Sequence, residues 1–306
     1  MESNVYDLII VGSGPAGLTA GIYANRYKLK TLVIGKVNGG LMTEAYKICN
    51  FPTEEKITGF ELTEKMVKNA QAQGVKIINK EVIDITEFGK LFKIVSFDNM
   101  KFISRSVILA YGTTHRRLDL FREKELLGKG ISYCATCDGM FFKNKVVAVV
   151  GGSNSAITSA LYLSDIAKKV YIIYRGKKLR GEPAWVESVN QCKNVEIIFN
   201  SQVAELIGEN KLEKIKISNG VQLDINGLFI EIGTEPIKYD FIKNLKIDTD
   251  KKGYIKVNQA QQTSKKGVWA AGDLTTGSNN FRQIITACAE GAIASESVFK
   301  YLKTSI

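Results

Sequence analysis

The sequence predicts an α/β protein built from two βαβ units, and three observations lead to this prediction. Two continuous apolar runs end in glycine-rich turns, and each turn is followed by residues with helical spacing. Glycine is plentiful at 27 residues and proline scarce at 4, which suits glycine-dependent turns between regular elements. At 306 residues the chain is long enough for about two domains.

The first predicted unit begins near the N-terminus. VYDLIIVG reads as a buried strand that ends in GSGPAG, LTAGIYANRYK as a helix, and KTLVIG as a second buried strand. Gly12 permits a tight turn, Gly14 lets the backbone approach a pyrophosphate, and Gly17 lets the helix pack on the strand. This placement predicts a Rossmann-like fold with a bound dinucleotide. The acidic residue that usually follows the second strand is missing, because Gly35 and Lys36 stand there.

The second predicted unit is KVVAVVGGSNSAITSALYLSDIAKKVYIIYRG. Gly151 takes the first position of its turn and Ala156 the third, whereas Ser153 stands where the second glycine belongs. The serine therefore places a side chain where backbone would approach a pyrophosphate. Two such units predict two nucleotide-fold domains.

The remaining segments complete this outline. YGTTHRRL (111–118) and IGTEPIKYD (232–240) have the character of crossings between the two domains. GVWAAGDL (267–274) predicts a strand that ends in Gly-Asp, and FRQIITACAEGAIASESVFKYL predicts a long helix after it.

The stretch YCATCDG (133–139) lies just ahead of the second unit and places two thiols three positions apart. A zinc site would need a second such pair or nearby histidines, but the single histidine is His115, so no metal is expected. An odd number of cysteines without a secretion signal argues against a disulfide framework. We therefore interpret the pair as a redox-active dithiol, and the other three cysteines as small buried hydrophobic residues. The five cysteines are Cys49, Cys134, Cys137, Cys192 and Cys288.

A working dithiol needs a thiolate and a proton carrier. The thiolate attacks a disulfide, so one cysteine needs a lowered pKa or a nearby base. A CxxC at the start of a helix brings both sulfurs within bonding reach. Asp138 is the natural acid or base, although it could also be an exposed residue that only caps a helix. His115 is expected to be structural or exposed.

The net charge of +11 needs an explanation, and a charged binding partner is one that can be considered. Clustered basic residues with stacking aromatics are absent, so nucleic-acid binding is not expected. A solvated lysine-rich surface is one explanation, and attraction to an acidic protein is the other. The N-terminus has no signal-peptide features and no apolar run reaches membrane-spanning length, so we expect a cytoplasmic protein without membrane contact.

In order and spacing, GSGPAG, CATCD before the second turn, and AAGD with RQ near the C-terminus resemble low-molecular-weight, flavin-dependent thioredoxin reductases over essentially the whole chain. NGGLMTEAYKICNFPT (38–53) is similar to the flavin-facing loop of that family. The resemblance implies two Rossmann-like nucleotide-binding domains, the second inserted into the first. The FAD-binding domain would comprise 1–114 and 243–306, and the inserted pyridine-nucleotide-type domain, 115–242, would carry the CxxC. It also implies a homodimer, a domain rotation, and thioredoxin as the partner.

The resemblance also implies roles for single residues. Cys134 would attack the thioredoxin disulfide and Cys137 would face the flavin. Asp273 would hold the ribityl chain of FAD. This chain departs from the family's usual residues at Leu41, Tyr111, Thr113 and Ala289. The implied FAD-binding residues are Gly12, Gly14, Pro15, Ala16, Gly17, Gly40, Asn50, Gly112, Gly272, Asp273, Arg282, Gln283 and Ile284.

The electron donor is the point at which the sequence departs from the family. NADPH-dependent members carry HRRDxFRA, whose arginines grip the 2′-phosphate, but this chain has YRGKKLRG (174–181), which retains only Arg175 and Arg180. NADH would need an acid roughly 20 residues beyond the turn, and none occurs from Ile166 to Gly181. A few members with eroded nucleotide motifs use reduced ferredoxin, and ferredoxins are acidic, as thioredoxins usually are. Ferredoxin is therefore the predicted donor, with weakly bound NADPH, or NADH, as the alternative.

Two rival classes share the dithiol. A flavin dithiol oxidase would pass electrons to oxygen and act on a small dithiol, whereas a redox-sensing flavoprotein would signal by binding a partner. A ferredoxin–NADP reductase of the same fold would normally lack the CxxC. The positive charge favours protein partners, and the intact CATCD favours turnover.

Overall fold

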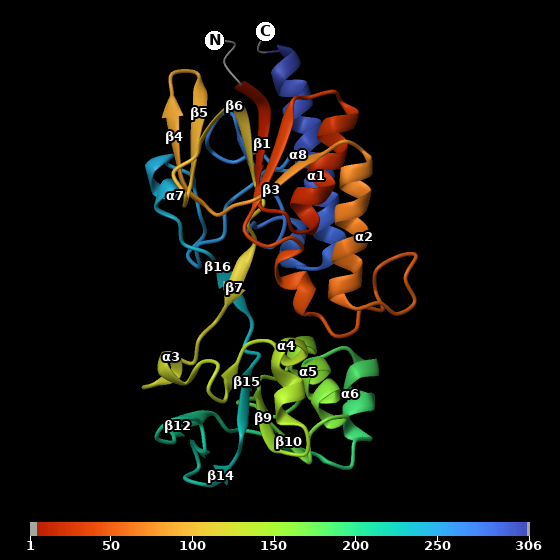
Figure 1. Cartoon of the computed structure of the whole chain (residues 1–306), viewed down its shortest axis with the longest axis vertical. Coiled ribbons are helices and arrows are strands. Elements are labelled where there is room, and N and C mark those ends of the chain that lie inside the picture. The colour runs from red at the N-terminus through yellow and green to blue at the C-terminus, as the bar shows by residue number, and fades with distance from the viewer. Residues whose placement is uncertain (1–4, 305–306) are drawn as a thin grey trace. The chain divides into compact units, whose positions relative to one another are not determined.

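The computed structural model describes residues 5–304 and divides into two compact units. The second unit lies within the sequence of the first, and strands β7 (Thr113–His115) and β16 (Thr234–Pro236) pair where the chain passes between them (Figure 1). Unit 1 comprises Met1–Thr43, Ile48–Thr114 and Glu235–Ile306, and unit 2 comprises Glu44–Lys47 and His115–Thr234.

Unit 1 is built on a seven-stranded sheet in the order β3-β2-β1-β6-β5-β4, with β17 beside β6. The pairs β1–β2, β2–β3, β1–β6 and β6–β17 are parallel, whereas β4–β5 and β5–β6 are antiparallel. The strands are β1 (Val5–Val11), β2 (Thr31–Gly35), β3 (Lys76–Asn79), β4 (Val82–Phe88), β5 (Leu91–Ser96), β6 (Lys101–Leu109) and β17 (Val268–Ala270).

The two faces of this sheet are covered differently because successive side chains of a strand point to opposite faces. Leu8 and Ile10 of β1 pack with helices α1 (Pro15–Arg26), α2 (Gly59–Ala72) and α8 (Ile284–Thr304). Ile9 and Val11 face the other way and pack with β5 and with Phe241 of α7 (Asp240–Asn244). Figure 1 shows the three long helices on one side of β1, and α7 with the β4–β5 hairpin on the other.

Local sequence explains where these helices begin. Pro15 stands in the first turn of α1, where its missing N–H costs no hydrogen bond. Thr58 and Glu61 form a capping box that starts α2. The long C-terminal helix was predicted to include FRQ, but α8 begins only at Ile284. The reason is that Thr286 Oγ1 accepts a hydrogen bond from the backbone of Gln283 at 3.0 Å, which holds the preceding residues outside the helix.

Unit 2 is built on a five-stranded, fully parallel sheet in the order β11-β10-β9-β15-β8. Helix α5 (Asn154–Ser164) packs its apolar side on β9, and α6 (Pro183–Asn190) packs beside it. The strands are β8 (Ile131–Ser132), β9 (Val146–Val150), β10 (Lys169–Ile173), β11 (Val195–Ile198) and β15 (Gly227–Ile230).

An antiparallel three-stranded sheet, which the sequence did not predict, completes unit 2. Its strands are β12 (Val203–Ile207), β13 (Lys214–Ile217) and β14 (Gln222–Asp224), and the remaining short helices of the chain are α3 (Glu123–Leu126), α4 (Ala135–Asp138), η1 (Gly40–Glu44), η2 (Gly139–Phe142) and η3 (Ser278–Asn280). Between residues 5 and 304, no helix combines the length and the apolar composition that a membrane crossing requires.

Candidate active site

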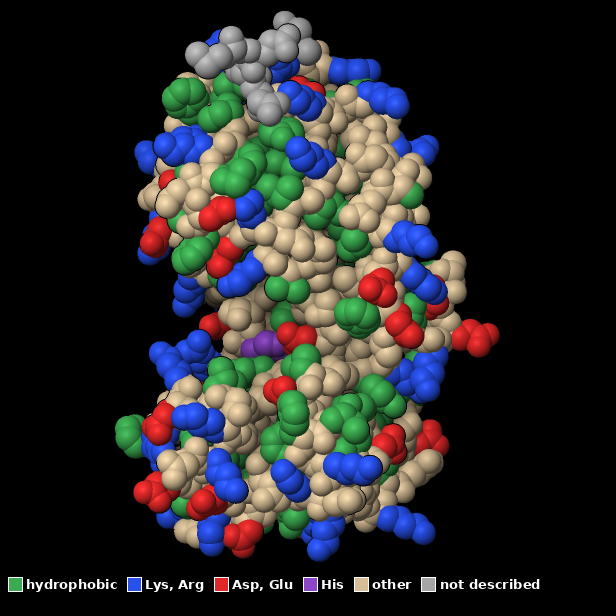
Figure 2. Space-filling view, viewed as in Figure 1, with side chains coloured by type: hydrophobic (Ala, Val, Ile, Leu, Met, Phe, Trp, Pro, Cys, Tyr) green, Lys and Arg blue, Asp and Glu red, His purple; other side chains and the backbone are tan. Residues whose placement is uncertain are grey.

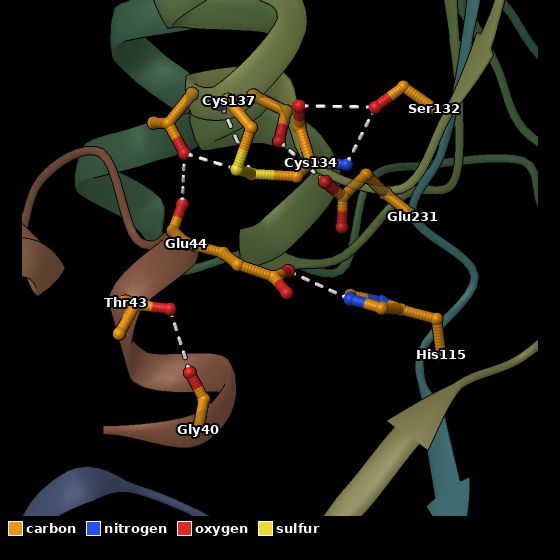
Figure 3. The surroundings of a disulfide bond; sticks show 10 residues. Gly40, Thr43, Glu44, His115, Ser132, Cys134, Cys137 and Glu231 are labelled. Atoms are coloured by element: carbon orange, nitrogen blue, oxygen red, sulfur yellow. Dashed lines mark hydrogen bonds and ion pairs between the residues drawn. A yellow bond between two sulfur atoms is a disulfide. The ribbon is translucent and has the colours of Figure 1, made fainter. Parts of the chain in front are cut away.

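Cys134 and Cys137 form a disulfide at the C-terminal edge of the unit 2 sheet (Figure 3). The chain leaves β8, and Cys134 then stands at the N-cap of the short helix α4, so a single turn brings the two Cα atoms to 5.3 Å. The backbone N–H of Cys137 donates to Cys134 Sγ at 3.1 Å. The dithiol predicted from CATCD therefore lies at a helix start, as expected.

Polar neighbours hold the first cysteine in place. The Cys134 N–H donates to Ser132 Oγ at 3.0 Å, and the same hydroxyl donates to the Cys134 carbonyl at 3.2 Å. Thr136 Oγ1 lies 3.3 Å from Cys134 Sγ. The Thr136 hydroxyl donates to the Glu44 carbonyl at 2.6 Å, so the donor directed at Cys134 Sγ is the backbone N–H of Cys137. A donor close to a sulfur favours its thiolate form, so after reduction this N–H would support a reactive Cys134. Cys134 is half-buried and Cys137 is exposed.

Asp138 is the last residue of α4 and is half-buried. It also stands at the N-cap of the following helix η2, but its side chain makes no capping hydrogen bond there. The geometry therefore does not support the alternative in which Asp138 only caps a helix. Its role as acid or base stays a prediction.

A group of titratable side chains in unit 2 was missed by the sequence reasoning. His115 was expected to be structural or exposed; it is half-buried, and its Nε2 lies 2.8 Å from a carboxylate oxygen of Glu44, a contact that suits a structural role. Burial lowers the pKa of His115. The hydrogen bond and the negative charge of Glu44 raise it, and the charge of Glu231 adds to this effect, so that the pKa is raised overall. The His115 ring also stacks on Tyr133, the neighbour of Cys134, at 5.5 Å between centroids.

Glu231 follows β15 directly and is only 9% exposed. Its carboxylate, labelled in Figure 3, accepts a hydrogen bond, and the donor is Ser159 Oγ at 2.8 Å. Burial raises the pKa of this carboxyl to about 7, against the lowering effect of Ser159 and His115. The one sequence signal for it was a carboxylate placed at the end of the apolar run GLFI.

The predicted glycine turn of unit 1 is tightly packed. Gly12 has a φ of 114°, and a Cβ there would lie 2.2 Å from the carbonyl oxygen of Ala110. A Cβ on Gly17 would lie 1.9 Å from the Gly12 carbonyl oxygen, which leaves no space for any side chain. By contrast, a Cβ on Gly14 would meet only Gly39 O at 3.7 Å, so the backbone at Gly14 stays approachable from one side.

The other predicted cofactor residues of unit 1 converge on this turn. A Cβ on Gly272, which follows β17, would lie 3.0 Å from the Cβ of Ala16. The N–H of Gly39, the neighbour of Gly40, donates to Ser13 O at 2.8 Å. Gly112 follows the end of β6, two residues after Ala110. The carboxyl ends of β1, β6 and β17 thus meet at one edge of the sheet, which is where open α/β sheets bind ligands.

The loop that carries Asp273 is anchored by Glu290 of α8, a buried residue that the sequence reasoning missed. Its carboxylate accepts hydrogen bonds from Gly272 N at 2.7 Å, Thr275 Oγ1 at 3.0 Å and Ser278 Oγ at 2.6 Å. The pKa of Asp273 is raised to about 6, mainly by burial. The positive charge of Arg282 lowers this pKa, and the negative charge of Glu290 raises it. A small pocket between this loop and α8 includes Asp273, Thr275, Arg282 and Glu290 in its lining.

Arg282 and Gln283 lie on the same loop. Arg282 Nε donates to the Asp273 carbonyl at 3.0 Å, and its guanidinium lies 3.8 Å from the centroid of the Tyr254 ring. Asn50 Nδ2 donates to Gln283 Oε1 at 3.1 Å. The structure therefore brings together the two predicted flavin-pocket residues Asn50 and Gln283, and Ile284 begins α8 beside them.

Four buried side-chain oxygens in unit 1, those of Asn38, Thr86, Thr113 and Gln261, have no hydrogen-bond partner among residues 5–304, and two of the four are next to predicted cofactor residues. Asn38 Oδ1 is next to the Gly39–Gly40 turn, and Thr113 Oγ1 is next to Gly112. Unpaired buried polar atoms are costly, so both suit a polar ligand that lies along this edge. Together with the approachable backbone at Gly14, they show that the residues of this edge fit a dinucleotide such as FAD.

The second glycine turn, in unit 2, is less open. Gly151 has a φ of 146°, and a Cβ there would meet Glu231 O at 2.2 Å. A Cβ on Gly152 would lie 2.5 Å from the buried ring of Tyr174. Ser153 stands at the N-cap of α5 without a side-chain hydrogen bond to the helix. Arg180 lies with its guanidinium 5.8 Å from the Tyr174 ring centroid.

No group of three or more His, Cys, Asp or Glu in the part of the chain described is arranged to hold a metal ion.

Two dinucleotide-type folds and a disulfide between them in sequence define a class of redox protein. Residues 6–291 match the pyridine nucleotide-disulphide oxidoreductase family, and the chain belongs to this family. It is a disulfide oxidoreductase.

Within the family, the chain has the fold of a thioredoxin reductase. A thioredoxin reductase of Listeria innocua is 38% identical over 99% of this chain and 95% of its own length. The crystal structure of Lactococcus lactis thioredoxin reductase is 35% identical, covers 98% of this chain and 99% of its own, and has a TM-score of 0.93. A ferredoxin-flavin thioredoxin reductase from Clostridium acetobutylicum is 32% identical, covers 98% and 99%, and has a TM-score of 0.54.

Proposed function

We propose that the protein is an FAD-dependent thioredoxin reductase. The observation that carries this proposal is the disulfide between Cys134 and Cys137 at the start of α4. It lies in a chain whose other unit has a glycine turn that fits a dinucleotide. Curated relatives of similar length, such as the one from Listeria innocua, are named thioredoxin reductases, which supports thioredoxin as the substrate.

Unit 1 is the FAD-binding domain in this proposal and unit 2 carries the dithiol. The backbone N–H groups at the start of α1, beyond Pro15, would hold the diphosphate of FAD, because the helix dipole favours negative charge there. Asp273 would hold the ribityl chain, and the hydrogen bond between Asn50 and Gln283 would keep these two side chains in place beside the flavin. When bound, FAD would accept electrons one at a time and pass on the two that reduction of a disulfide requires.

The reaction balances as two exchanges. Two electrons and two protons convert the Cys134–Cys137 disulfide into two thiols. One thiolate then attacks the disulfide of thioredoxin and forms a mixed disulfide between the two proteins. The second cysteine attacks this mixed disulfide, so the Cys134–Cys137 disulfide forms again and thioredoxin leaves with two thiols. Asp138 takes a proton from one thiol and returns it to the departing thioredoxin sulfur.

Reduced ferredoxin is the proposed electron donor, with two molecules giving one electron each. Ser153 occupies the position at which an approachable glycine would be needed, and the second arginine of the phosphate-binding sequence is replaced by Gly176. The net charge of +11 suits two acidic protein partners. The similar protein from Clostridium acetobutylicum, which is named a ferredoxin-flavin thioredoxin reductase, gives this choice of donor a precedent.

NADPH is the second candidate donor, because Arg175 and Arg180 are retained beside the second glycine turn. In that case the unit 2 turn would bind the cofactor weakly. The homodimer and the cytoplasmic location predicted from the sequence stay predictions.

An anaerobic titration of the yellow protein tests the proposal. Reduced ferredoxin, NADPH and NADH are added separately while the flavin absorbance is followed, each with and without thioredoxin. We expect ferredoxin alone to bleach the flavin, and thioredoxin to restore the colour. Fast bleaching by NADPH would assign that donor instead, and rapid peroxide formation with a small dithiol would assign a dithiol oxidase.

A further inference from the structure

One segment of unit 1 carries a large excess of positive charge. Residues 238–266, here called the basic segment, contain eight lysines and three aspartates, a net charge of +5 out of the +11 of the whole chain. Figure 2 shows Lys and Arg side chains spread over the visible face among acidic ones. A second basic run, 166–181 in unit 2, has six basic residues and no acid. The basic segment is distinguished from it by its contacts with the loop that carries Asp273, as described below.

Most of these lysines are free to meet a partner. Lys265 forms an ion pair with Glu87 at 2.6 Å, but the other seven are exposed and form no ion pair within residues 5–304. One of the three aspartates is engaged locally, because Asp250 Oδ1 accepts hydrogen bonds from the backbone N–H groups of Lys252 and Tyr254 at 2.8 and 2.9 Å. The seven exposed lysines are Lys238, Lys243, Lys246, Lys251, Lys252, Lys256 and Lys266.

Hydrogen bonds join much of the basic segment into one layer. Lys256 N donates to Asp248 O at 3.0 Å, Asp248 N donates to Ser264 Oγ at 2.9 Å, and that hydroxyl donates to Lys246 O at 3.4 Å. The buried side chains Phe241, Leu245 and Ile255 attach the layer to the face of the sheet opposite α1 and α8. The lysines are thus held by a packed scaffold.

This layer is bonded directly to the loop that carries Asp273. Ile255 N donates to Leu274 O at 2.9 Å, and Thr276 N donates to Ile255 O at 2.9 Å. The guanidinium of Arg282 stacks on Tyr254 at 3.8 Å. Lys252 and Lys256 flank these contacts in sequence, so a protein bound to them would lie one layer of chain from the proposed flavin loop.

We propose that the basic segment is the surface on which the acidic electron-donor protein docks. The inference rests on the proposed function, and it goes further by naming the surface and the mode of recognition. A small iron–sulfur protein with a negative surface would be steered to these lysines, where each molecule gives up one electron and leaves. Two such encounters deliver the two electrons that the disulfide consumes.

The test compares two triple variants of the FAD-loaded enzyme that change the net charge equally. The docking variant is K251E/K252E/K256E. The control is K28E/K68E/K76E, whose lysines are exposed, unpaired among the described residues, and lie in or next to the elements α1, α2 and β3. Flavin content and melting temperature establish first that both variants fold like the wild type.

The measurement is the anaerobic rate of flavin bleaching by a small acidic ferredoxin that has been reduced beforehand. At low salt we expect the docking variant to be slower by about 10- to 100-fold and the control by no more than about threefold. At about 0.5 M salt the difference should disappear because surface charges are then screened. Reduced methyl viologen, a cation, should bleach the docking variant at least as fast as the wild type.

Equal slowing of the two variants would overturn the proposal, because total charge and not this surface would then matter. An unchanged rate in the docking variant would overturn it as well. Failure of ferredoxin to bleach the wild type is a different result, which would overturn the proposed donor itself.

Discussion

Asn50 donates a hydrogen bond to Gln283 at 3.1 Å, although 233 positions separate the two residues in the sequence. Asn50 lies between η1 and α2, and Gln283 lies directly before α8. The contact ties the loop after β2 to the loop after β17, and both loops were predicted to face the flavin. It therefore links two segments that must act together if the edge of the sheet binds FAD.

The Asn50–Gln283 bond should support cofactor retention. Replacing Asn50 with alanine removes one hydrogen bond, worth about 1 kcal/mol, so we expect FAD to dissociate about fivefold faster. The measurement is the recovery of flavin fluorescence after dilution of the loaded protein. Asn69→Ala, at an exposed position of α2, is the matched control and should leave the rate unchanged. Equal dissociation rates in both variants would contradict the assignment.

Glu290 should stabilise unit 1 and its cofactor loop. Glu290→Ala leaves three donors without their acceptor, which should cost about 3 kcal/mol of unfolding free energy and empty much of the FAD site. Glu290→Gln keeps one acceptor oxygen and should cost less. Thermal unfolding and the flavin-to-protein absorbance ratio report both effects.

The control for that experiment lies on the same helix. Glu296 forms an exposed ion pair with Lys300, and such pairs contribute little. Glu296→Ala should therefore change stability by less than about 0.5 kcal/mol. If the alanine variants at 290 and 296 behaved alike, Glu290 would have no anchoring role.

The dithiol should be essential for thioredoxin reduction but not for flavin reduction. Cys134→Ser and Cys137→Ser remove one sulfur each, so the disulfide cannot form and transfer to thioredoxin should fall by about 1,000-fold or more. Bleaching of the flavin by the electron donor should persist. Cys49→Ser is the control, because Cys49 is a free cysteine and is exposed, so its predicted burial was wrong. Thioredoxin reduction that survived in either active-site variant would refute the dithiol route.

Glu231 should make the stability of unit 2 depend on pH. Its pKa is raised to about 7 in the fold from the ordinary value of 4.5, so the folded state binds more protons than the unfolded state between these values. Stability is then fully present below about pH 4.5 and falls as pH rises toward 7, by up to about 3 kcal/mol. His115, whose pKa is also raised, acts in the same direction, and Glu44 and Ser159 are the other groups that face this cluster.

The measurement is urea unfolding at several pH values from about 4.5 to about 7.5, a range that spans both pKa values of Glu231. Glu231→Gln keeps an acceptor for Ser159 but cannot ionise, so its stability should vary less with pH than that of the wild type. Parallel curves for the two proteins would show that Glu231 is not the titrating group.

Local sequence was enough to predict the parts of the fold that depend on local rules. The glycine turns of both units, the dithiol at the start of α4 and the strand before Asp273 follow from spacing and from backbone constraints at Gly12 and Gly17. Hydrophobic runs also indicated the parallel strands β1, β2, β9 and β10. The start of α8 was placed too early because the Thr286 contact with Gln283 cannot be read from periodicity.

The buried acids could not be predicted in this way. Glu290 and Glu231 occupy positions where a helical or strand pattern admits any residue, and their importance comes from donors that lie 12 to 72 residues away along the chain. The contact of His115 with Glu44 could not be predicted for the same reason, because the two residues are 71 positions apart. Networks of this kind depend on tertiary packing, which a single sequence does not display.

The most direct test of the central claim counts electrons from donor to thioredoxin. Reduced ferredoxin, the enzyme and excess oxidised thioredoxin are mixed without oxygen, and the oxidised ferredoxin and the new thioredoxin thiols are both measured. The account predicts two ferredoxins oxidised for every thioredoxin disulfide reduced, and no thiols with the Cys137→Ser variant. Thiols that appear with NADPH but not with ferredoxin would contradict the proposed donor, and thiols formed by the variant would contradict the dithiol itself.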